Sequence, residues 1–158
     1  MLRILTAIAM VLSAASAFAG GDAPDPREGI RIYKAHDDYD WVKQSLEIAI
    51  TGRGLLISGT LHISDMLART GKDLGFGEPI YVKAESIEFC SAEMSHRMAM
   101  VHPANLSVCP FTIALYIPAD DPQQVYVAFR VPSLRGDASV IESAIFGLLD
   151  GIAHEAIQ

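Results

Sequence analysis

Two runs of alternating apolar and polar residues in the second half of the chain constrain its fold more than any other feature. In the first run, Phe111 to Ile117, and in the second, Val125 to Val131, every other residue is large and apolar. This period of two is typical of strands that bury one face. The turn-rich ADDPQQ segment between the runs is short, so the pattern predicts an antiparallel hairpin that packs one face against a core.

The periodicity elsewhere predicts alternating strands and helices before this hairpin and one helix after it. Extended segments are expected at residues 30–35, 55–61 and 80–89, and helices at 41–50, 64–70, 91–102 and 139–156. The last helix begins at a predicted capping box of Ser139 and Glu142. This order predicts an α+β fold, a two-layer sandwich with a mixed sheet of four to five strands and helices packed mainly on one face.

The third extended segment, Ile80 to Phe89, contains an irregularity. Its apolar residues change phase between Ala84 and Ile87. Such a change is typical of a β-bulge, or of two separate short strands. We therefore expect only the part from Ile87 to Phe89 to form a core strand.

The start of the chain has the layout of a secretory signal peptide. Arg3 precedes an apolar run, and small residues follow it up to Ala17-Phe18-Ala19. The apolar run is shorter than the roughly 20 residues that span a bilayer. The sequence therefore predicts a signal peptide at residues 1–19, a flexible leader at 20–29 and a single α+β domain at 30–158. We expect a periplasmic protein whose mature chain does not insert into the membrane.

Charge and missing motifs narrow the class of function. The chain has 12 basic and 19 acidic residues and a net charge of -7. Nucleic acid and anionic lipid require clustered Lys and Arg, so we expect no nucleic-acid partner. The sequence contains no nucleophile elbow, no H-E-x-x-H, no phosphate loop and no G-x-G-x-x-G. This favours a non-enzymatic protein without catalytic residues.

The segment from Glu88 to Phe111 contains both cysteines of the chain. Two cysteines in an exported protein predict a disulfide, because oxidising compartments favour the bond. A bond between Cys90 and Cys109 would close a loop of about 20 residues and stabilise the fold by about 3 kcal/mol on chain-entropy arguments. The alternative is a reactive thiol, because Cys90 lies just ahead of a predicted helix whose dipole lowers a thiol pKa. If the second and third strands were parallel, His62 and Cys90 would meet at one sheet edge, where α/β folds bind ligands.

The same segment is rich in methionine and histidine, whose side chains suit Cu(I). Met94, Met98 and His102 lie on one stripe of the predicted helix, at about 100° per residue. Together with His62 they are candidate ligands for copper or for noncovalently bound haem. The alternative, which we favour, is that Met94 and Met98 fill the core, as methionine commonly does.

Several short motifs carry a family resemblance. They are His62 with Met66-Leu67, IEFCSA at residues 87–92, CPF at 109–111, and then LYIP and VYVAFR. Together, over roughly residues 39–131, they resemble the domain-of-unknown-function 302 (DUF302) family of small bacterial proteins. The resemblance implies a compact α/β domain, often paired as a dimer, with no agreed biochemical activity and no catalytic residues to carry over. We therefore expect a homodimer.

Three functions remain open at this point. The favoured one is an exported, non-enzymatic accessory or small-ligand-binding module, stabilised by a disulfide and paired as a homodimer. The second is a copper or haem carrier that uses the methionine and histidine side chains, with Cys90 as a further candidate ligand. The third is a thiol redox protein that uses Cys90.

Overall fold

The computed structural model describes residues 29–158, so the expected signal peptide and nearly all of the expected leader lie outside the described residues. The strands are β1 (Ile30–Ala35), β2 (Leu56–His62), β3 (Tyr81–Cys90), β4 (Phe111–Pro118) and β5 (Val125–Arg130). The helices are α1 (Tyr39–Thr51), α2 (Ile63–Gly71), α3 (Ala92–Val101), the 3-10 helix η1 (Pro103–Val108) and α4 (Ser139–Ala156). Apart from η1, this is the order that the sequence predicts.

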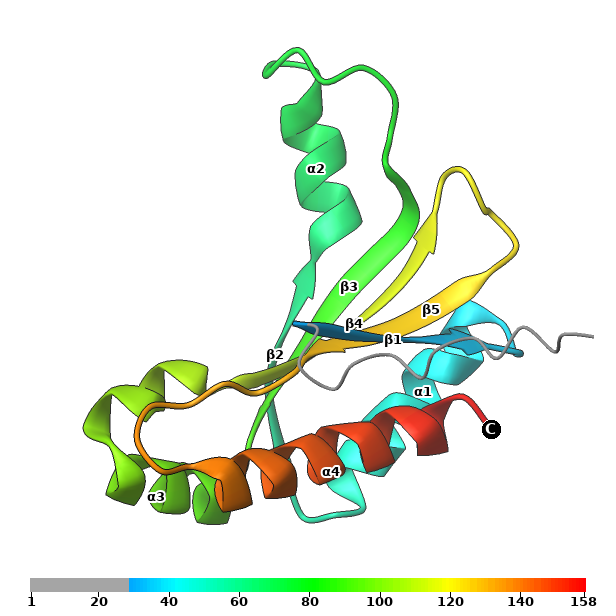
Figure 1. The fold of residues 1–158 in the computed structure, drawn as a ribbon. Helices are drawn as coiled ribbons and strands as arrows, with labels where there is room; N and C mark the ends of the chain where they lie inside the picture. Colours follow the sequence, from blue (N-terminus) through cyan, green and yellow to red (C-terminus); the bar gives the residue numbers. More distant parts are fainter. Residues whose placement is uncertain (1–28) are drawn as a thin grey trace, which may run out of the picture.

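The five strands form one sheet in the order β1-β5-β4-β3-β2. Helices α1 and α4 lie side by side across one face of this sheet, and α3 lies near the start of α4 (Figure 1). The predicted α+β sandwich, with helices packed mainly on one face of a sheet, is therefore confirmed.

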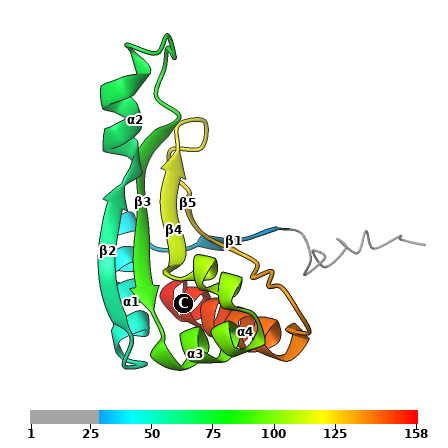
Figure 2. The same cartoon turned by 90° about the vertical axis from the view of Figure 1, so that its left-hand side faces the viewer.

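The expected mixed sheet is wrong in one respect, because every strand pairing in the described part of the chain is antiparallel. Parallel pairing of β2 and β3 would require the chain to cross back along the sheet between them. Helix α2 instead projects beyond the ends of both strands (Figure 2). The chain then returns along β3, so β2, α2 and β3 form one elongated hairpin.

The core lies between the covered face of the sheet and helices α1 and α4. The sheet contributes alternate residues of β3, β4 and β5, namely Ile87, Phe89, Phe111, Ile113, Leu115, Val125, Val127 and Phe129. The helices contribute residues at helical spacing, namely Val42, Leu46 and Ile50 from α1 and Ile145, Leu149 and Ile152 from α4. Full burial of one such side chain stabilises a fold by about 1.5–3 kcal/mol, so this layer is the main source of stability.

Two of the four α-helices begin at side-chain caps. The Oδ1 atom of Asp38 accepts a hydrogen bond of 2.9 Å from the backbone N–H of Trp41, at the start of α1. The hydroxyl of Ser91 accepts one of 3.3 Å from the N–H of Met94, at the start of α3. These bonds satisfy N–H groups that have no partner within the first helical turn.

Strand β3 is continuous over ten residues, so the phase change in its sequence has another cause than the expected bulge between Ala84 and Ile87. The strand alternates regularly there and places Glu85 on the covered face, beside Ile87 and Phe89 on the same strand. Glu85 is only 6% exposed. The register irregularity of β3 lies nearer its start. The phase change therefore marks a buried carboxylate in a regular strand.

Helix α2 and the segment that follows it stand apart from the other helices (Figure 2). No residue of α2 is buried. Leu74 and Phe76 in the following loop are each 67% exposed, and Ile80 is 61% exposed. We call residues 63–80 the α2 arm. No helix among residues 29–158 is both long and apolar enough to cross a membrane.

Candidate functional site

The two cysteines lie side by side at one end of the sheet. Cys90 is the last residue of β3, and Cys109 follows η1. Their Sγ atoms are 3.3 Å apart, and both residues are partly exposed. Because a disulfide bond is about 2.05 Å long, the structure contains two thiols in contact and not the predicted covalent bond. The disulfide itself stays a prediction.

A buried amide holds η1, and therefore Cys109, in place. The side-chain NH2 group of Asn105 donates to the carbonyl oxygens of Met98, at 3.0 Å, and Arg135, at 3.1 Å. Its side-chain oxygen accepts a bond of 2.7 Å from the N–H of Arg135. These bonds tie η1 to α3 and to the segment before α4. No local sequence pattern predicts this structural role of Asn105, because the partners of its side chain come from other parts of the chain.

The surroundings of Cys90 do not favour a thiolate. The hydrogen bond with Cys109, burial, and the negative charge of Glu88 raise the pKa of the Cys90 thiol. The expectation that the start of α3 lowers this pKa is therefore wrong, because the neighbouring thiol and carboxylate act in the opposite direction. Because the two Sγ atoms are in contact, any chemistry of Cys90 takes place next to the thiol of Cys109.

Two of the candidate metal ligands, Met94 and Met98, lie in α3, and a third, His102, follows it directly. Met98 is fully buried, and Met94 packs against the same core cluster, which agrees with the interpretation that we favour. The Nδ1 atom of His102 accepts a hydrogen bond of 3.1 Å from the N–H of Ala104. Among residues 29–158, no group of three His, Cys, Asp or Glu side chains is arranged to hold a metal ion. Copper or haem binding by Met94, Met98, His102 and His62 stays a prediction.

His62 lies far from the cysteines. In the antiparallel pair of β2 and β3, His62 is opposite Glu85, whereas Cys90 is opposite Leu56. The residues from Glu85 to Cys90 span about 17 Å, at about 3.4 Å per residue. The expectation that His62 and Cys90 meet at one sheet edge depended on parallel strands, and it is wrong because the strands are antiparallel.

Glu85 is the centre of a polar cluster that the sequence analysis missed. Its Oε2 atom accepts hydrogen bonds from Lys43 Nζ, at 2.8 Å, and Tyr39 OH, at 3.1 Å. Its Oε1 atom lies 2.7 Å from Nδ1 of His62. Burial alone would raise the pKa of Glu85, but hydrogen bonds from Lys43 and Tyr39 and the nearby positive charge outweigh burial and lower it. Since both oxygens already have partners, the cluster ties α1 to β2 and β3. The phase change in β3 was its only sequence signal.

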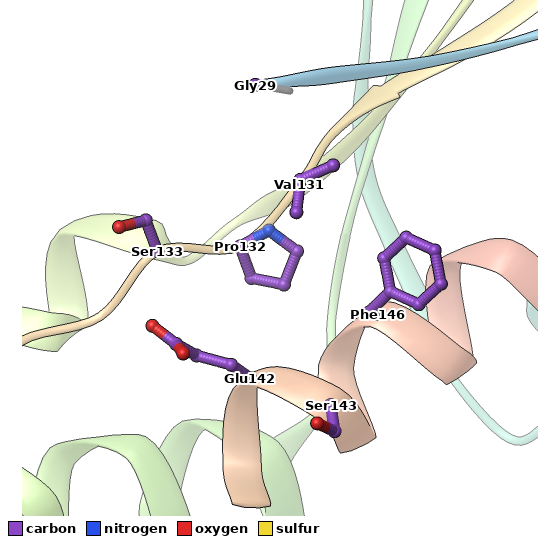
Figure 3. A pocket seen from close by; sticks show the side chains of 7 residues that line it. All are labelled: Gly29, Val131, Pro132, Ser133, Glu142, Ser143 and Phe146. Atoms are coloured by element: carbon purple, nitrogen blue, oxygen red, sulfur yellow. The ribbon is translucent and has the colours of Figure 1, made fainter. Parts of the chain in front are cut away.

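A hollow of about 370 Å³ lies between α4 and the segment after β5 (Figure 3). It is lined by Gly29, Val131, Pro132, Ser133, Glu142, Ser143 and Phe146. Glu142 does not form the predicted capping box, because the residue before α4 is Ala138 and no side chain caps the helix. The carboxylate of Glu142 instead accepts a bond of 2.6 Å from the N–H of Leu134. It therefore holds the loop beside the hollow.

A second hollow, of about 360 Å³, lies in and beside the α2 arm. Its apolar lining residues are Leu67, Ala68, Leu74, Phe76, Pro79 and Ile80, and its polar ones include Ser64, Thr70, Lys72, Glu78 and Tyr81. An apolar lining with a few polar groups is typical of sites for small molecules. The sequence gives no signal of a binding site in the α2 arm, because its apolar residues are also compatible with core packing.

Comparisons with known proteins bear on the fold. No family model matches the sequence, and no curated protein matches it. The structure is similar to the crystal structure of an uncharacterized conserved protein, DUF302, from Bacillus stearothermophilus, with a TM-score of 0.63 and 10% sequence identity. The match covers 82% of this chain and 98% of that chain. The chain has a DUF302-like fold. This confirms the resemblance at the level of fold, and the matched protein is itself described as uncharacterized.

Proposed function

We propose that the protein is an exported, non-enzymatic binding module whose α2 arm holds a small apolar ligand. The observation that carries this proposal is the hollow of about 360 Å³ in the α2 arm. Leu74 and Phe76 line the hollow, yet each is 67% exposed. Contiguous exposed apolar side chains mark binding surfaces. Covering them with an apolar molecule gains roughly 25 cal/mol per Å² of apolar surface removed from water.

The polar residues of the hollow indicate the class of ligand. Lys72 offers a positive charge, Glu78 offers a negative one, and the hydroxyls of Ser64, Thr70 and Tyr81 offer hydrogen bonds. A molecule with an apolar body and one anionic or polar end matches this lining. Fatty acids of medium length belong to this class.

Binding of the fluorescent dye anilinonaphthalene sulfonate, followed by displacement with a medium-chain fatty acid, tests the proposal. The dye combines an apolar body with an anionic group, so it should bind the wild-type protein saturably and the fatty acid should displace it. Phe76→Ser should weaken dye binding about tenfold, which corresponds to about 1.4 kcal/mol.

Leu106→Ser is the matched control for this experiment. Leu106 is 62% exposed but lies in η1, outside the α2 arm. This variant should bind the dye like the wild-type protein. Equal dye binding by the Phe76→Ser variant would contradict the proposal.

The second part of the proposal is that Cys90 and Cys109 form a disulfide in the exported protein. Two observations support it: the Sγ atoms are 3.3 Å apart, and the chain has no other cysteine. The oxidant would be a partner that carries a disulfide. One thiolate attacks that disulfide, and the second displaces the partner, so the partner leaves as a dithiol with both electrons and both protons.

The mass of protein isolated from the periplasm tests both the export and the disulfide. The expected mature chain begins at Gly20 and is two hydrogens lighter than its reduced form. Cys90→Ser should lower the free energy of unfolding by about 2–5 kcal/mol under oxidising conditions, and much less under reducing conditions. Two titratable thiols in unfolded, unreduced protein would exclude the disulfide, and an intact Met1 would exclude cleavage.

A further inference from the structure

We propose that the reduced Cys90–Cys109 pair is a binding site for Cu(I), in which the two thiolates are the ligands. This donor set differs from the methionine and histidine side chains that the sequence suggests. The site lies at the opposite end of β3 from the α2 arm, so it does not depend on the proposed apolar ligand.

The chemistry of the donors selects the ion. Thiolates are soft ligands, and Cu(I) is a soft ion that prefers them. Structural sites for Zn²⁺ use four protein ligands. No cluster of even three His, Cys, Asp or Glu side chains suited to a metal is found within residues 29–158. Two adjacent thiols therefore fit an ion that accepts low coordination.

The distance between the two Sγ atoms is near the range in which two thiolates can bind one metal ion. Metal–thiolate bonds are about 2.3 Å long, so a linear arrangement needs sulfur atoms about 4.5 Å apart, and a bent arrangement needs less. The present separation is 3.3 Å. Cys90 ends β3, and Cys109 lies between η1 and β4. Side-chain rotation at these two positions can open the pair by about 1.2 Å, as a linear arrangement needs, without moving the sheet.

An ion can reach the pair from solvent. Both cysteines are partly exposed, so solvent reaches each of the two residues. Binding releases both thiol protons, and the resulting complex of one Cu(I) ion and two thiolates carries a charge of minus one. The start of α3, next to Cys90, favours negative charge. The negative charge of the Glu88 carboxylate, two residues before Cys90, opposes it.

Cu(I) binding and the disulfide are alternative states of the same two sulfur atoms. An oxidised pair has no thiolate to offer, so only reduced protein should bind the ion. Bound Cu(I) should in turn protect both sulfur atoms from oxidation and alkylation.

The test is an anaerobic titration of reduced, metal-free mature protein with Cu(I), in competition with bicinchoninate. One ion per chain should bind, with an ultraviolet thiolate-to-copper absorption. Cys90→Ser and Cys109→Ser should each weaken binding by more than about 100-fold, because each removes one of two ligands. Glu88→Gln should tighten binding about fivefold by removing a repelling charge. His62→Gln and His102→Gln are the matched controls and should bind like the wild-type protein.

Two outcomes would overturn the assignment. The first is unchanged affinity in a cysteine variant whose circular dichroism matches that of the wild-type protein. The second uses only wild-type protein, so it does not depend on whether the variants fold. One equivalent of Cu(I) should protect both thiols from N-ethylmaleimide, as measured by mass, and unprotected thiols would refute the site. Neither result bears on dye binding by the α2 arm.

Discussion

Glu85 is a carboxylate of β3 that contacts charged or polar side chains from two other elements. It is buried, and its partners Lys43 and His62 come from α1 and β2. A buried carboxylate is tolerated only when it is paired, because an unpaired buried charge is strongly destabilising. Three elements therefore meet at one side chain, and its ionisation should be visible in the stability of the whole domain.

Glu85→Gln is expected to lower the free energy of unfolding by about 1.5–3 kcal/mol at pH 7, the usual contribution of a hydrogen bond to a charged group. The pKa of Glu85 in the folded protein lies below its ordinary value of 4.5. The carboxylate therefore contributes its full stabilisation above that value, and the contribution is lost as the pH falls through the lower, folded-state pKa.

Urea denaturation between pH 3 and pH 7 measures this contribution. The wild-type protein should lose more stability towards acid than Glu85→Gln does. Glu47→Gln is the matched control, because Glu47 is a partly exposed carboxylate of α1, whereas Glu85 is buried, and it should change stability by less than about 0.5 kcal/mol. Parallel pH profiles of the wild-type protein and Glu85→Gln would contradict the assigned role of Glu85.

Helix α2 differs from the three other described α-helices in that none of its residues is buried. It has nine residues and buries none of them, whereas α4 has 18 residues and buries six. Isolated helices shorter than about 12–15 residues are marginally stable in water. Helix α2 therefore depends on contacts along the α2 arm, and a ligand in the hollow would supply more of them.

Hydrogen exchange measured by mass spectrometry should show this difference. Amides of residues 63–71 should exchange much faster than amides in the middle of α4, because local opening of α2 exposes almost no buried surface. Saturation with the dye or the fatty acid should slow exchange in α2 and leave α4 unchanged. Equal protection of α2 and α4 without ligand would show that α2 is held by contacts other than those described.

For the molecule as a whole, we predict a homodimer. Strand β2 forms one edge of the sheet, and its residues Leu56 and Leu61 are at least half exposed. Edge strands with exposed apolar side chains favour pairing with a second copy. Sedimentation at tens of micromolar should therefore show a dimer.

A charge on the β2 edge should weaken this dimer. Leu61→Lys should shift the protein towards the monomer, because lysine on an edge strand opposes pairing. Val140→Lys, at a 75% exposed position on α4, should leave the dimer intact and serves as the matched control. A wild-type monomer at tens of micromolar would count against self-association, and an unaffected Leu61→Lys dimer would count against the β2 edge.

The sequence by itself determined the features that depend on neighbours along the chain. Alternation in β4 and β5 predicted a hairpin, and helical periodicity predicted the four α-helices, because the period of a pattern is a local property. The packing of Met94 and Met98 could be predicted for the same reason.

Only the tertiary structure decided the features that depend on residues distant in sequence. It made β2 and β3 antiparallel, which separates His62 from Cys90. It also buried Glu85 beside partners from two other elements, and it brought the Sγ atoms of Cys90 and Cys109 into contact. The exposure of the α2 arm is decided in the same way. Local sequence patterns report backbone period, whereas strand direction, charge burial and side-chain contact depend on how the elements pack.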